Sequence, residues 1–374
     1  MDWVTSATSD TPTATGSASP SPAGADLLSA YGGWPGVITH VVEGRDLSAP
    51  QAAAAMGTIL SGGATPAQLI ALTVALRIKG ETADELSGLL DAVLAAGEQV
   101  PLSDEVRASA VDIVGTGGDR SHSINVSTMA AIVTAGAGVP VCKHGARAAS
   151  SKCGTADVLE ALGVVLELSP AGVARCVDEA GIGFCFAPRF HPAFRFAAPA
   201  RREVGIPLVF NLLGPMANPG RVRRQVIGVA DPRFAERMLA SLRAHGSTDT
   251  WVVHGGGLDE LSTTGPSTVL ALDHDGGVRT FTIDAVELGL APATEEQLVG
   301  GDPAENADVV RRVLAGEHGA HRDIVVLNAA AALVVGGAAA SMADGLVLAV
   351  DSIDSGKAAA TLERLVAVSQ AAAD

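Results

Sequence analysis

Aromatic residues are scarce in this sequence. They make up 3% of the 374 residues, whereas hydrophobic residues of all kinds make up 48%. The interior must therefore be built from Ala, Val, Leu and Ile, which favours close-packed helices and buried parallel strands. The length suggests two domains, each with ample core, because typical domains hold about 100–200 residues.

Basic residues are also few relative to acidic ones. The chain has 25 Lys and Arg against 41 Asp and Glu, which gives a formal net charge of −16. Proteins that bind nucleic acid need a basic stripe to displace the counterions of the phosphate backbone. The charge balance therefore argues against a nucleic-acid partner, although an acidic protein can still contain a basic cleft.

Cysteines are few and widely spaced. Cys142, Cys153, Cys176 and Cys185 form no Cys-x-x-Cys pair, so the spacing indicates neither a zinc site nor a disulfide framework. This cysteine pattern fits a cytoplasmic protein best.

Signals for export or membrane insertion are missing as well. Residues 1–25 are rich in Ser, Thr, Ala, Pro and Gly and lack the basic start and apolar run of a secretory signal, so we predict a disordered tail. The uncharged stretch from Val325 to Met342 is interrupted by Asn328 and Gly336. We predict that it forms a buried helix pair and does not span a membrane.

Helix signals dominate from Ala49 to about Gly97. Thr65 and Thr82 each precede a Gln or Glu by three residues, the spacing of a capping box, and Pro66 suits the first position of a helix. These signals predict a small helical unit.

After this unit the pattern changes to short apolar runs that alternate with helical stretches. Such alternation is typical of an α/β fold with a mainly parallel sheet. We expect a hairpin from Thr268 to Ile283 around Asp275-Gly276-Gly277, and helices in the last ninety residues. The predicted strands are Val111–Val114, Val139–Cys142, Gly163–Leu166, Gly183–Ala187, Val226–Ala230 and Thr250–His254.

Three segments that follow predicted strands have the composition of an anion site. Gly115-Thr116-Gly117-Gly118-Asp119 has three glycines in four positions, which allows phosphate to approach the backbone N–H groups closely. The segment from Asn125 to Thr128 begins a helix, whose free N–H groups attract anions. Lys143 to Ser151 combines two cations, two hydroxyls and a glycine within nine residues. The alternatives are an ordinary turn, an ordinary helix cap and a solvated loop.

Two further pairs carry charge suited to ligands. Asp259-Glu260 follows a strand and a run of three glycines, and adjacent carboxylates suit Mg²⁺, which usually shares its ligands with substrate phosphates. Arg201-Arg202 includes an arginine that could clamp a substrate carboxylate in a bidentate pair. Surface carboxylates and a solvated arginine are the alternatives.

Together these segments resemble the anthranilate phosphoribosyltransferase family, whose members join anthranilate to phosphoribosyl diphosphate in tryptophan biosynthesis. The resemblance spans about Ala49 to Val335. It consists of GTGGD, NVSTMAAIV, KHG-RAASS, GTADVLEALG, FAPRFHPAFR, NLLGPMANP and GLDEL, in that order along the chain.

The resemblance implies a helical domain over residues 26–104, with a returning segment near residues 195–220, hinged to an α/β domain over residues 105–374. It also implies a homodimer and two Mg²⁺ ions, held by Ser127, Asp259 and Glu260. Lys143, Asp259 and Glu260 would be the catalytic residues, and His144 is a candidate for taking the released proton.

The implied ligand contacts fall into two sets. Phosphoribosyl diphosphate would lie against Gly115, Gly118, Asp119, Ser123, Asn125, Val126, Ser127, Thr128, Lys143, His144, Gly145, Ala146, Arg147, Ala148, Ala149, Ser150, Ser151 and Thr155. Anthranilate would lie against Gly115, His144, Ala146, Pro188, His191 and Arg201, with Arg201 binding its carboxylate.

One position departs from the family pattern. The family's loop reads Lys-His-Gly-Asn-Arg and its asparagine helps to position anthranilate, but this chain has Ala146 there. Losing one such hydrogen bond costs about 1 kcal/mol. Three functions therefore stay open: anthranilate phosphoribosyltransferase, a paralogue that ribosylates another aromatic amine or acid, and a noncatalytic nucleotide- or nucleic-acid-binding relative.

Overall fold

Helices at the N-terminal end confirm the helical unit that the capping motifs predict. The computed structural model describes residues 28–148 and 152–373, so the predicted tail over residues 1–25 lies outside the described residues. Thr65 Oγ1 accepts a hydrogen bond from Gln68 N at 3.2 Å, and Gln68 Oε1 accepts one from Thr65 N at 2.9 Å. The helices are α2 (Trp34–Val42), α3 (Ala49–Leu60), α4 (Pro66–Lys79) and α5 (Ala83–Ala96).

The described residues of the larger lobe form a seven-stranded sheet of order β3-β2-β1-β4-β5-β6-β7. Strands β1 to β5 are parallel, and β6 and β7 join antiparallel at one edge, which confirms the mainly parallel sheet and the appended hairpin. The strands are β1 (Val111–Gly115), β2 (Val141–Gly145), β3 (Ile182–Phe186), β4 (Arg224–Gly228), β5 (Asp249–His254), β6 (Ser267–Leu272) and β7 (Val278–Ile283).

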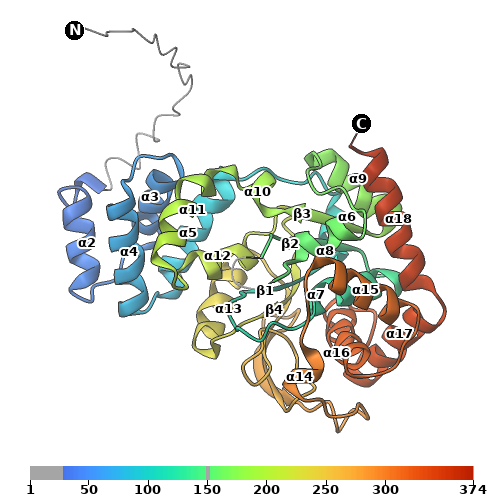
Figure 1. Ribbon diagram of the computed structural model, residues 1–374. Coiled ribbons are helices and arrows are strands. Elements are labelled where there is room, and N and C mark those ends of the chain that lie inside the picture. The colour runs from blue at the N-terminus through green and yellow to red at the C-terminus, as the bar shows by residue number, and fades with distance from the viewer. Residues whose placement is uncertain (1–27, 149–151, 374) are drawn as a thin grey trace, which may run out of the picture.

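The sheet separates two hydrophobic cores because neighbouring residues of a strand point to opposite faces. Ile113 and Val226 belong to a core shared with α7 (Val126–Gly136) and α16 (Ala320–Val335). Val114 and Ile227 belong to the other core, which continues into the helical lobe. Helix α13 (Ala235–Ala244) covers this face of the sheet and also contacts α5, which joins the sheet to the helical lobe (Figure 1).

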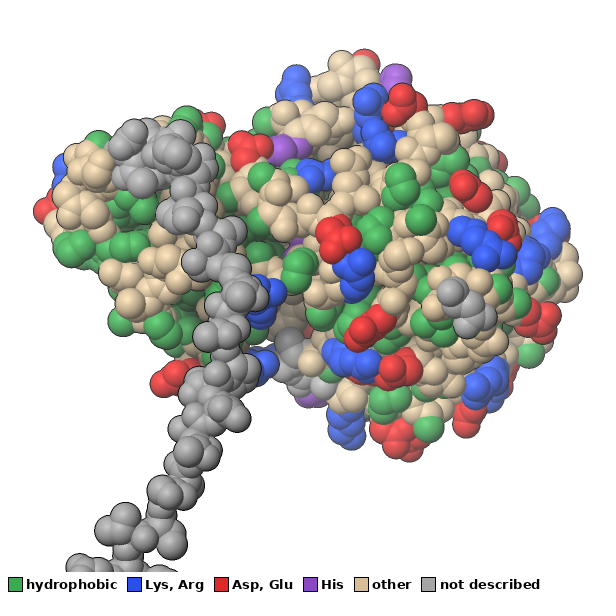
Figure 2. Space-filling model, turned by 90° about the horizontal axis from the view of Figure 1, so that it is seen from above, with side chains coloured by type: hydrophobic (Ala, Val, Ile, Leu, Met, Phe, Trp, Pro, Cys, Tyr) green, Lys and Arg blue, Asp and Glu red, His purple; other side chains and the backbone are tan. Residues whose placement is uncertain are grey.

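Two later helices return to the helical lobe. Helix α11 (Ala198–Val204) contacts α4, and α12 (Phe210–Met216) contacts α5. The domain boundaries themselves stay a prediction. Seen from above, the two lobes are separated by a hollow, and acidic and basic side chains are interspersed over the larger one (Figure 2).

The remaining helices surround the sheet, and those after residue 290 confirm the helical C-terminal part. No helix among the described residues is long and apolar enough to cross a membrane. These helices are α6 (Asp104–Ser109), α8 (Thr155–Ala161), α9 (Pro170–Ala180), α10 (Ala187–Phe190), α13 (Ala235–Ala244), α14 (Glu295–Leu298), α15 (Pro303–Leu314), α17 (Met342–Asp354) and α18 (Lys357–Ala371), with 3-10 turns at Pro192–Phe196 and Pro232–Phe234.

One predicted strand is wrong and two are displaced. Residues 163–166 form no strand. Val164, Leu166 and Leu168 are buried, as alternate residues of a strand would be, but the Val165 N–H donates to Ser369 Oγ of α18 at 3.1 Å and not to a neighbouring strand. An extended segment docked on a helix thus has the same alternation as a strand. Strand β2 begins two residues and ends three residues later than predicted, so it includes Lys143 and His144, and β4 begins and ends two residues earlier than predicted.

Candidate active site

The glycine turn after β1 lies against the loop that follows β5. Asp259 Oδ2 accepts a hydrogen bond from Gly117 N at 2.6 Å. A Cβ atom at Gly115 would lie 2.2 Å from the same oxygen, and a Cβ at Gly228 would lie 1.6 Å from the Asp259 carbonyl oxygen. Gly118 has φ of 82°, a conformation that favours glycine. The glycines therefore let the acidic loop approach the ends of β1 and β4.

The start of α7 meets the second carboxylate of that loop. Glu260 Oε1 accepts from Ser127 N at 3.1 Å. Asn125, the N-cap residue, makes no capping hydrogen bond; its side chain donates to the Cys153 carbonyl oxygen at 3.2 Å and accepts from Asn306 Nδ2 at 2.9 Å. A carboxylate thus occupies the positive end of this helix, while buried Val126 and Thr128 anchor the first turn.

Asp259 and Glu260 form a buried acidic pair with Lys143 as a nearby cation, and the pKa values of the two carboxyls are raised to about 7 and about 8. Burial raises the pKa of both carboxyls; the charge of Asp119 raises the pKa of Asp259 further, and the charge of Asp259 raises that of Glu260. Within the described residues, no group of three or more His, Cys, Asp or Glu side chains could hold a metal ion. The pair fits a divalent cation that takes its remaining ligands from substrate oxygens and water.

The segment between the turn and α7 is held by side-chain hydroxyls. Ser121 Oγ donates to Asp119 Oδ2 at 2.7 Å and lies within hydrogen-bond distance, 3.1 Å, of Ser123 Oγ. Arg120 and His122 adopt positive φ of 62° and 53°, an uncommon conformation for residues other than glycine. The loop is thereby fixed in a backbone shape that keeps Asp119 near Asp259.

Lys143 forms part of the floor of this site. It lies on β2 with 2% of its surface exposed, and its ammonium donates to the Ile113 carbonyl oxygen and, at 3.2 Å, to Ser127 Oγ. Burial lowers its pKa, while the charges of Asp112, Glu260 and Asp259 raise it. This lysine therefore ties β1 to the start of α7 and supplies a cation beneath the carboxylate pair.

The loop after β2 is organised by Asp157, not by free cations. Asp157 Oδ2 accepts from Ala148 N at 3.0 Å and from Gly154 N at 2.9 Å. Arg147 is already paired with Asp157 at 2.9 Å and Glu160 at 2.7 Å, so its guanidinium has little free charge for a ligand. Ala149, Ser150 and Ser151 lie outside the described residues. Thr155 Oγ1 lies 3.4 Å from Thr128 Oγ1, which connects this loop to α7.

Two buried imidazole rings lie side by side. The His144 and His191 ring centroids are 5.1 Å apart. His144 Nδ1 donates to the Gly214 carbonyl oxygen and His191 Nε2 to that of Ala217, both at 3.0 Å, so the other nitrogen of each ring is an acceptor. Burial lowers the pKa of both, to about 4 for His191. Both rings are therefore neutral at pH 7. Pro188, the second residue of α10, lies nearby in sequence and is exposed.

Arg201 on α11 has no carboxylate partner among the described residues. Its guanidinium lies 4.7 Å from the centre of the Phe210 ring and makes only a long contact, 3.5 Å, with Asn211 Oδ1. Burial lowers its pKa to about 10, so it remains charged at pH 7. A half-buried, unpaired guanidinium is suited to a ligand carboxylate.

The sequence interpretation missed Asp112 and Asn218. Asp112 is buried on β1; its carboxylate accepts from His144 N at 3.1 Å and from Asn218 Nδ2 at 2.7 Å. Burial raises its pKa to about 6, which the charge of Lys143 partly offsets. A carboxylate within an apolar strand was the available signal, because buried charges are usually paired.

Comparison with known proteins assigns a family to this arrangement. Residues 35–97 match the model of a glycosyl transferase family, helical bundle domain, and residues 107–359 match that of a glycosyl transferase family, a/b domain. The anthranilate phosphoribosyltransferase of Salinispora arenicola is 52% identical over 344 residues, covering 90% of this chain and 97% of the relative. The chain belongs to the anthranilate phosphoribosyltransferase family.

Other members of the family agree in sequence and structure. The Rhodococcus jostii relative is 51% identical over 88% of this chain and 92% of its own length. The crystal structure from Thermus thermophilus superposes with a TM-score of 0.83 at 40% identity, covering 89% of this chain and 99% of that chain. The Saccharomyces cerevisiae protein in complex with PRPP and Mg has a TM-score of 0.82 at 28% identity, covering 93% and 98%.

Proposed function

We propose that this chain transfers the 5-phosphoribosyl group from phosphoribosyl diphosphate to the amine of anthranilate and releases diphosphate. The observation that carries the proposal is the buried pair Asp259 and Glu260, which lies against the glycine turn and the start of α7 with Lys143 as a nearby cation. Negative side chains beside two anion-binding backbone segments suit a substrate whose phosphates arrive with a divalent cation.

The diphosphate of the donor would lie between the glycine turn and the N-terminus of α7. Gly117 and Ser127 N–H groups, which now donate to carboxylates, would be available to phosphate oxygens once these carboxylates bind cations. We propose two Mg²⁺ ions, held by Ser127, Asp259 and Glu260. Bound magnesium stabilises the charge that develops on the departing diphosphate. Lys143 supplies fixed positive charge close to the same oxygens.

The acceptor needs orientation more than activation. The amine of anthranilate is already neutral at pH 7, so alignment with the donor for in-line attack is the main requirement. Arg201 would bind the carboxylate, and the walls would be Pro188, His144 and His191. Nε2 of His144 is a buried acceptor without a partner among the described residues, which makes it the candidate for taking the proton released from the amine.

A direct assay tests the proposal. The chain is incubated with phosphoribosyl diphosphate, Mg²⁺ and a panel of aromatic amines, and released diphosphate is measured for wild type and for Asp259→Ala/Glu260→Ala. We expect anthranilate turnover by the wild type and a loss of at least about a hundredfold in the double variant, typical of removing charge stabilisation in a transition state. Equal rates would show that the carboxylate assignment is wrong.

A paralogous function is favoured by one observation. Ala146 is exposed in the loop after β2 and offers no side-chain hydrogen bond to an acceptor. If another amine of the panel turns over faster than anthranilate, and does so with the same Mg²⁺ and Asp259 dependence, the acceptor assignment changes and the donor assignment stands.

We also propose a homodimer formed through the helical lobe, in the cytoplasm. Val42 on α2 and Ile78 on α4 are 68% and 81% exposed, which is unusual for large apolar side chains unless another surface covers them. Light scattering on Ile78→Asp tests the dimer. A variant with the mass of a monomer supports a dimer interface at this surface, and a variant with the mass of a dimer excludes it.

A further inference from the structure

A cavity of about 380 Å³ opens at the amino ends of the parallel strands, away from the loops described above. Its lining residues include Arg223 and Ser247, which precede β4 and β5, and Arg107 of α6, which precedes β1. Leu94 at the end of α5 and Asn218 after α12 close its other side. The cavity therefore lies where the helical lobe meets the sheet.

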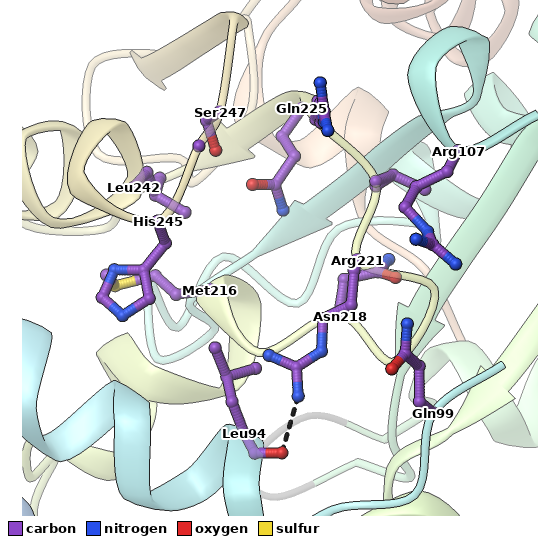
Figure 3. Close-up of a pocket in the computed structure, with 13 residues that line it drawn as sticks. Leu94, Gln99, Arg107, Met216, Asn218, Arg221, Gln225, Leu242, His245 and Ser247 are labelled. Carbon is purple, nitrogen blue, oxygen red and sulfur yellow. Dashed lines mark hydrogen bonds between the residues drawn. The ribbon is translucent and has the colours of Figure 1, made fainter. Parts of the chain in front are cut away.

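The lining is cationic in a chain that is acidic overall. Its side chains include Arg107, Arg221, Arg223 and His245, and none of the lining residues is Asp or Glu. In the view of Figure 3, Arg107 and Arg221 lie on one side of the space and His245 on the other. His245 Nε2 is bound to Asp91 at 3.0 Å, so the arginines are the main source of free charge.

These arginines have few carboxylate partners in the protein. Arg107 Nε is buried and has no hydrogen-bond partner among the described residues. Its Nη2 donates to the Leu102 carbonyl oxygen at 3.0 Å, and its one carboxylate contact is with the fully exposed Asp104 at 3.3 Å. Arg221 donates to the Leu94 carbonyl oxygen at 2.6 Å and has no carboxylate partner in the described part of the chain (Figure 3). Burial, followed by the charge of Arg107, lowers the pKa of Arg221. The two guanidinium groups thus repel each other.

We propose that this cavity binds a small phosphomonoester at the junction of the two lobes. Guanidinium groups present paired N–H donors that match phosphate oxygens, and a phosphate between Arg107 and Arg221 would replace their repulsion by attraction. The volume exceeds that of inorganic phosphate and falls within the range for small-molecule pockets, roughly 300–1,000 Å³, so there is room for an organic group. Asn218 and Gln225 supply polar groups for that part.

The site is separate from the active site but connected to it through Asn218. Asn218 lines the cavity, and its Nδ2 also donates to Asp112, whose other oxygen accepts from His144 N. Two hydrogen bonds, one from Asn218 and one from His144 N, both to Asp112, therefore connect the cavity lining to the strand that carries Lys143 and His144. The inference does not depend on which acceptor the active site uses.

Binding of inorganic phosphate to the full chain tests the site. Isothermal titration at constant ionic strength is performed on wild type, Arg223→Gln, Arg107→Gln/Arg223→Gln, and the control Arg312→Gln, an exposed arginine on α15 paired with Glu317. We expect the double variant to bind phosphate at this site about tenfold or more weakly than wild type, and the control to bind as wild type does.

The outcomes separate this site from the active site. Phosphate bound only at the carboxyl ends of the strands would give identical isotherms for all four proteins and would overturn the proposal. Arg223 is exposed and its side chain has no hydrogen bond or ion pair with any described residue, so the single variant keeps the test valid if the double variant unfolds. Loss of phosphate binding without loss of phosphoribosyl transfer would support the cavity whether or not the acceptor is anthranilate.

Discussion

At the carboxyl ends of the parallel strands, Asp259 and Glu260 lie with Asp119 nearby, whereas at the amino ends Arg107, Arg221 and Arg223 line a cavity without a carboxylate. The two edges thus concentrate charge of opposite sign. Elsewhere in the fold a buried charge has a partner of opposite sign, as Lys79 has in Glu85 at 2.8 Å. Leaving like charges together costs stability, and a ligand of the opposite charge removes that cost.

The edges also differ in how closely the backbone is packed. At the carboxyl edge a single Cβ at Gly115 or Gly228 would overlap the Asp259 loop. At the amino edge the space is open and lined by long side chains. Activity at the carboxyl edge should therefore be sensitive even to a Gly→Ala substitution. Ligand binding at the amino edge should be sensitive mainly to the removal of arginine charge.

Gly115→Ala gives the largest expected effect. The added Cβ would lie 2.2 Å from Asp259 Oδ2, so the carboxylate must move away from the glycine turn. We expect kcat/KM for phosphoribosyl transfer to fall at least about a hundredfold, comparable to the removal of a preorganised charge-stabilising group. Steady-state kinetics measures the effect.

The matched control is Gly57→Ala, the same chemical change on α3 with no atom within 4 Å of the new Cβ. Its kinetics should equal those of wild type. If Gly115→Ala retained full activity, close contact between the turn and the acidic loop would not be required.

The contrast between the edges also shows what the sequence could predict. The glycine turn, α7 and the acidic pair were predicted because each is a contiguous motif at the end of an apolar run. The arginine cavity was not, since Arg107, Arg221 and Arg223 come from segments separated by more than a hundred residues and join only in the folded chain. Asp112 was overlooked because its neighbours are apolar and its partner Asn218 lies far along the sequence.

The predicted boundaries of the strands were wrong for a related reason. The apolar run before Lys143 suggested that β2 ends at Cys142, but Lys143 and His144 are buried by pairing with groups from other segments and continue the strand. Sequence patterns therefore predict burial of apolar side chains well, and they miss polar side chains whose partners lie far along the chain.

Arg201→Gln is expected to give the next largest effect. Removing the unpaired guanidinium on α11 should raise KM for anthranilate roughly tenfold to a hundredfold, the range for a hydrogen-bonded charge pair, and leave KM for phosphoribosyl diphosphate unchanged. Neighbouring Arg202, which is exposed, provides the control Arg202→Gln. If Arg201→Gln and Arg202→Gln have the same KM for anthranilate, Arg201 does not bind the acceptor.

His191→Gln sharpens the electrostatic description of the carboxyl edge. The folded pKa of His191 is about 4, below its ordinary value of 6.5, so the unfolded chain binds more protons between these values. Stability from this ring is complete above pH 6.5 and is lost as the pH falls towards 4. Lowering the pH from 7 to 5 decreases the unfolding free energy of the wild type. We expect this decrease to be about 2 kcal/mol smaller in the variant.

Urea unfolding at both pH values measures this difference. For each protein, the unfolding free energy at pH 5 is compared with its own value at pH 7. The stability lost with the hydrogen bond to the Ala217 carbonyl is therefore present at both pH values and cancels. A variant with the same pH dependence as wild type would mean that His191 already takes up a proton in the folded protein near pH 6.

Ala146→Asn is expected to have the smallest effect and addresses the acceptor alone. The residue is exposed in the loop after β2, so the larger side chain can be added without displacing a core contact. If the chain uses anthranilate, one added hydrogen bond of about 1 kcal/mol should lower KM for anthranilate roughly fivefold. KM for phosphoribosyl diphosphate serves as the internal control and should stay constant. A gain in anthranilate turnover from near zero would instead favour the paralogue, and weaker anthranilate binding would mean that Ala146 already suits the natural acceptor.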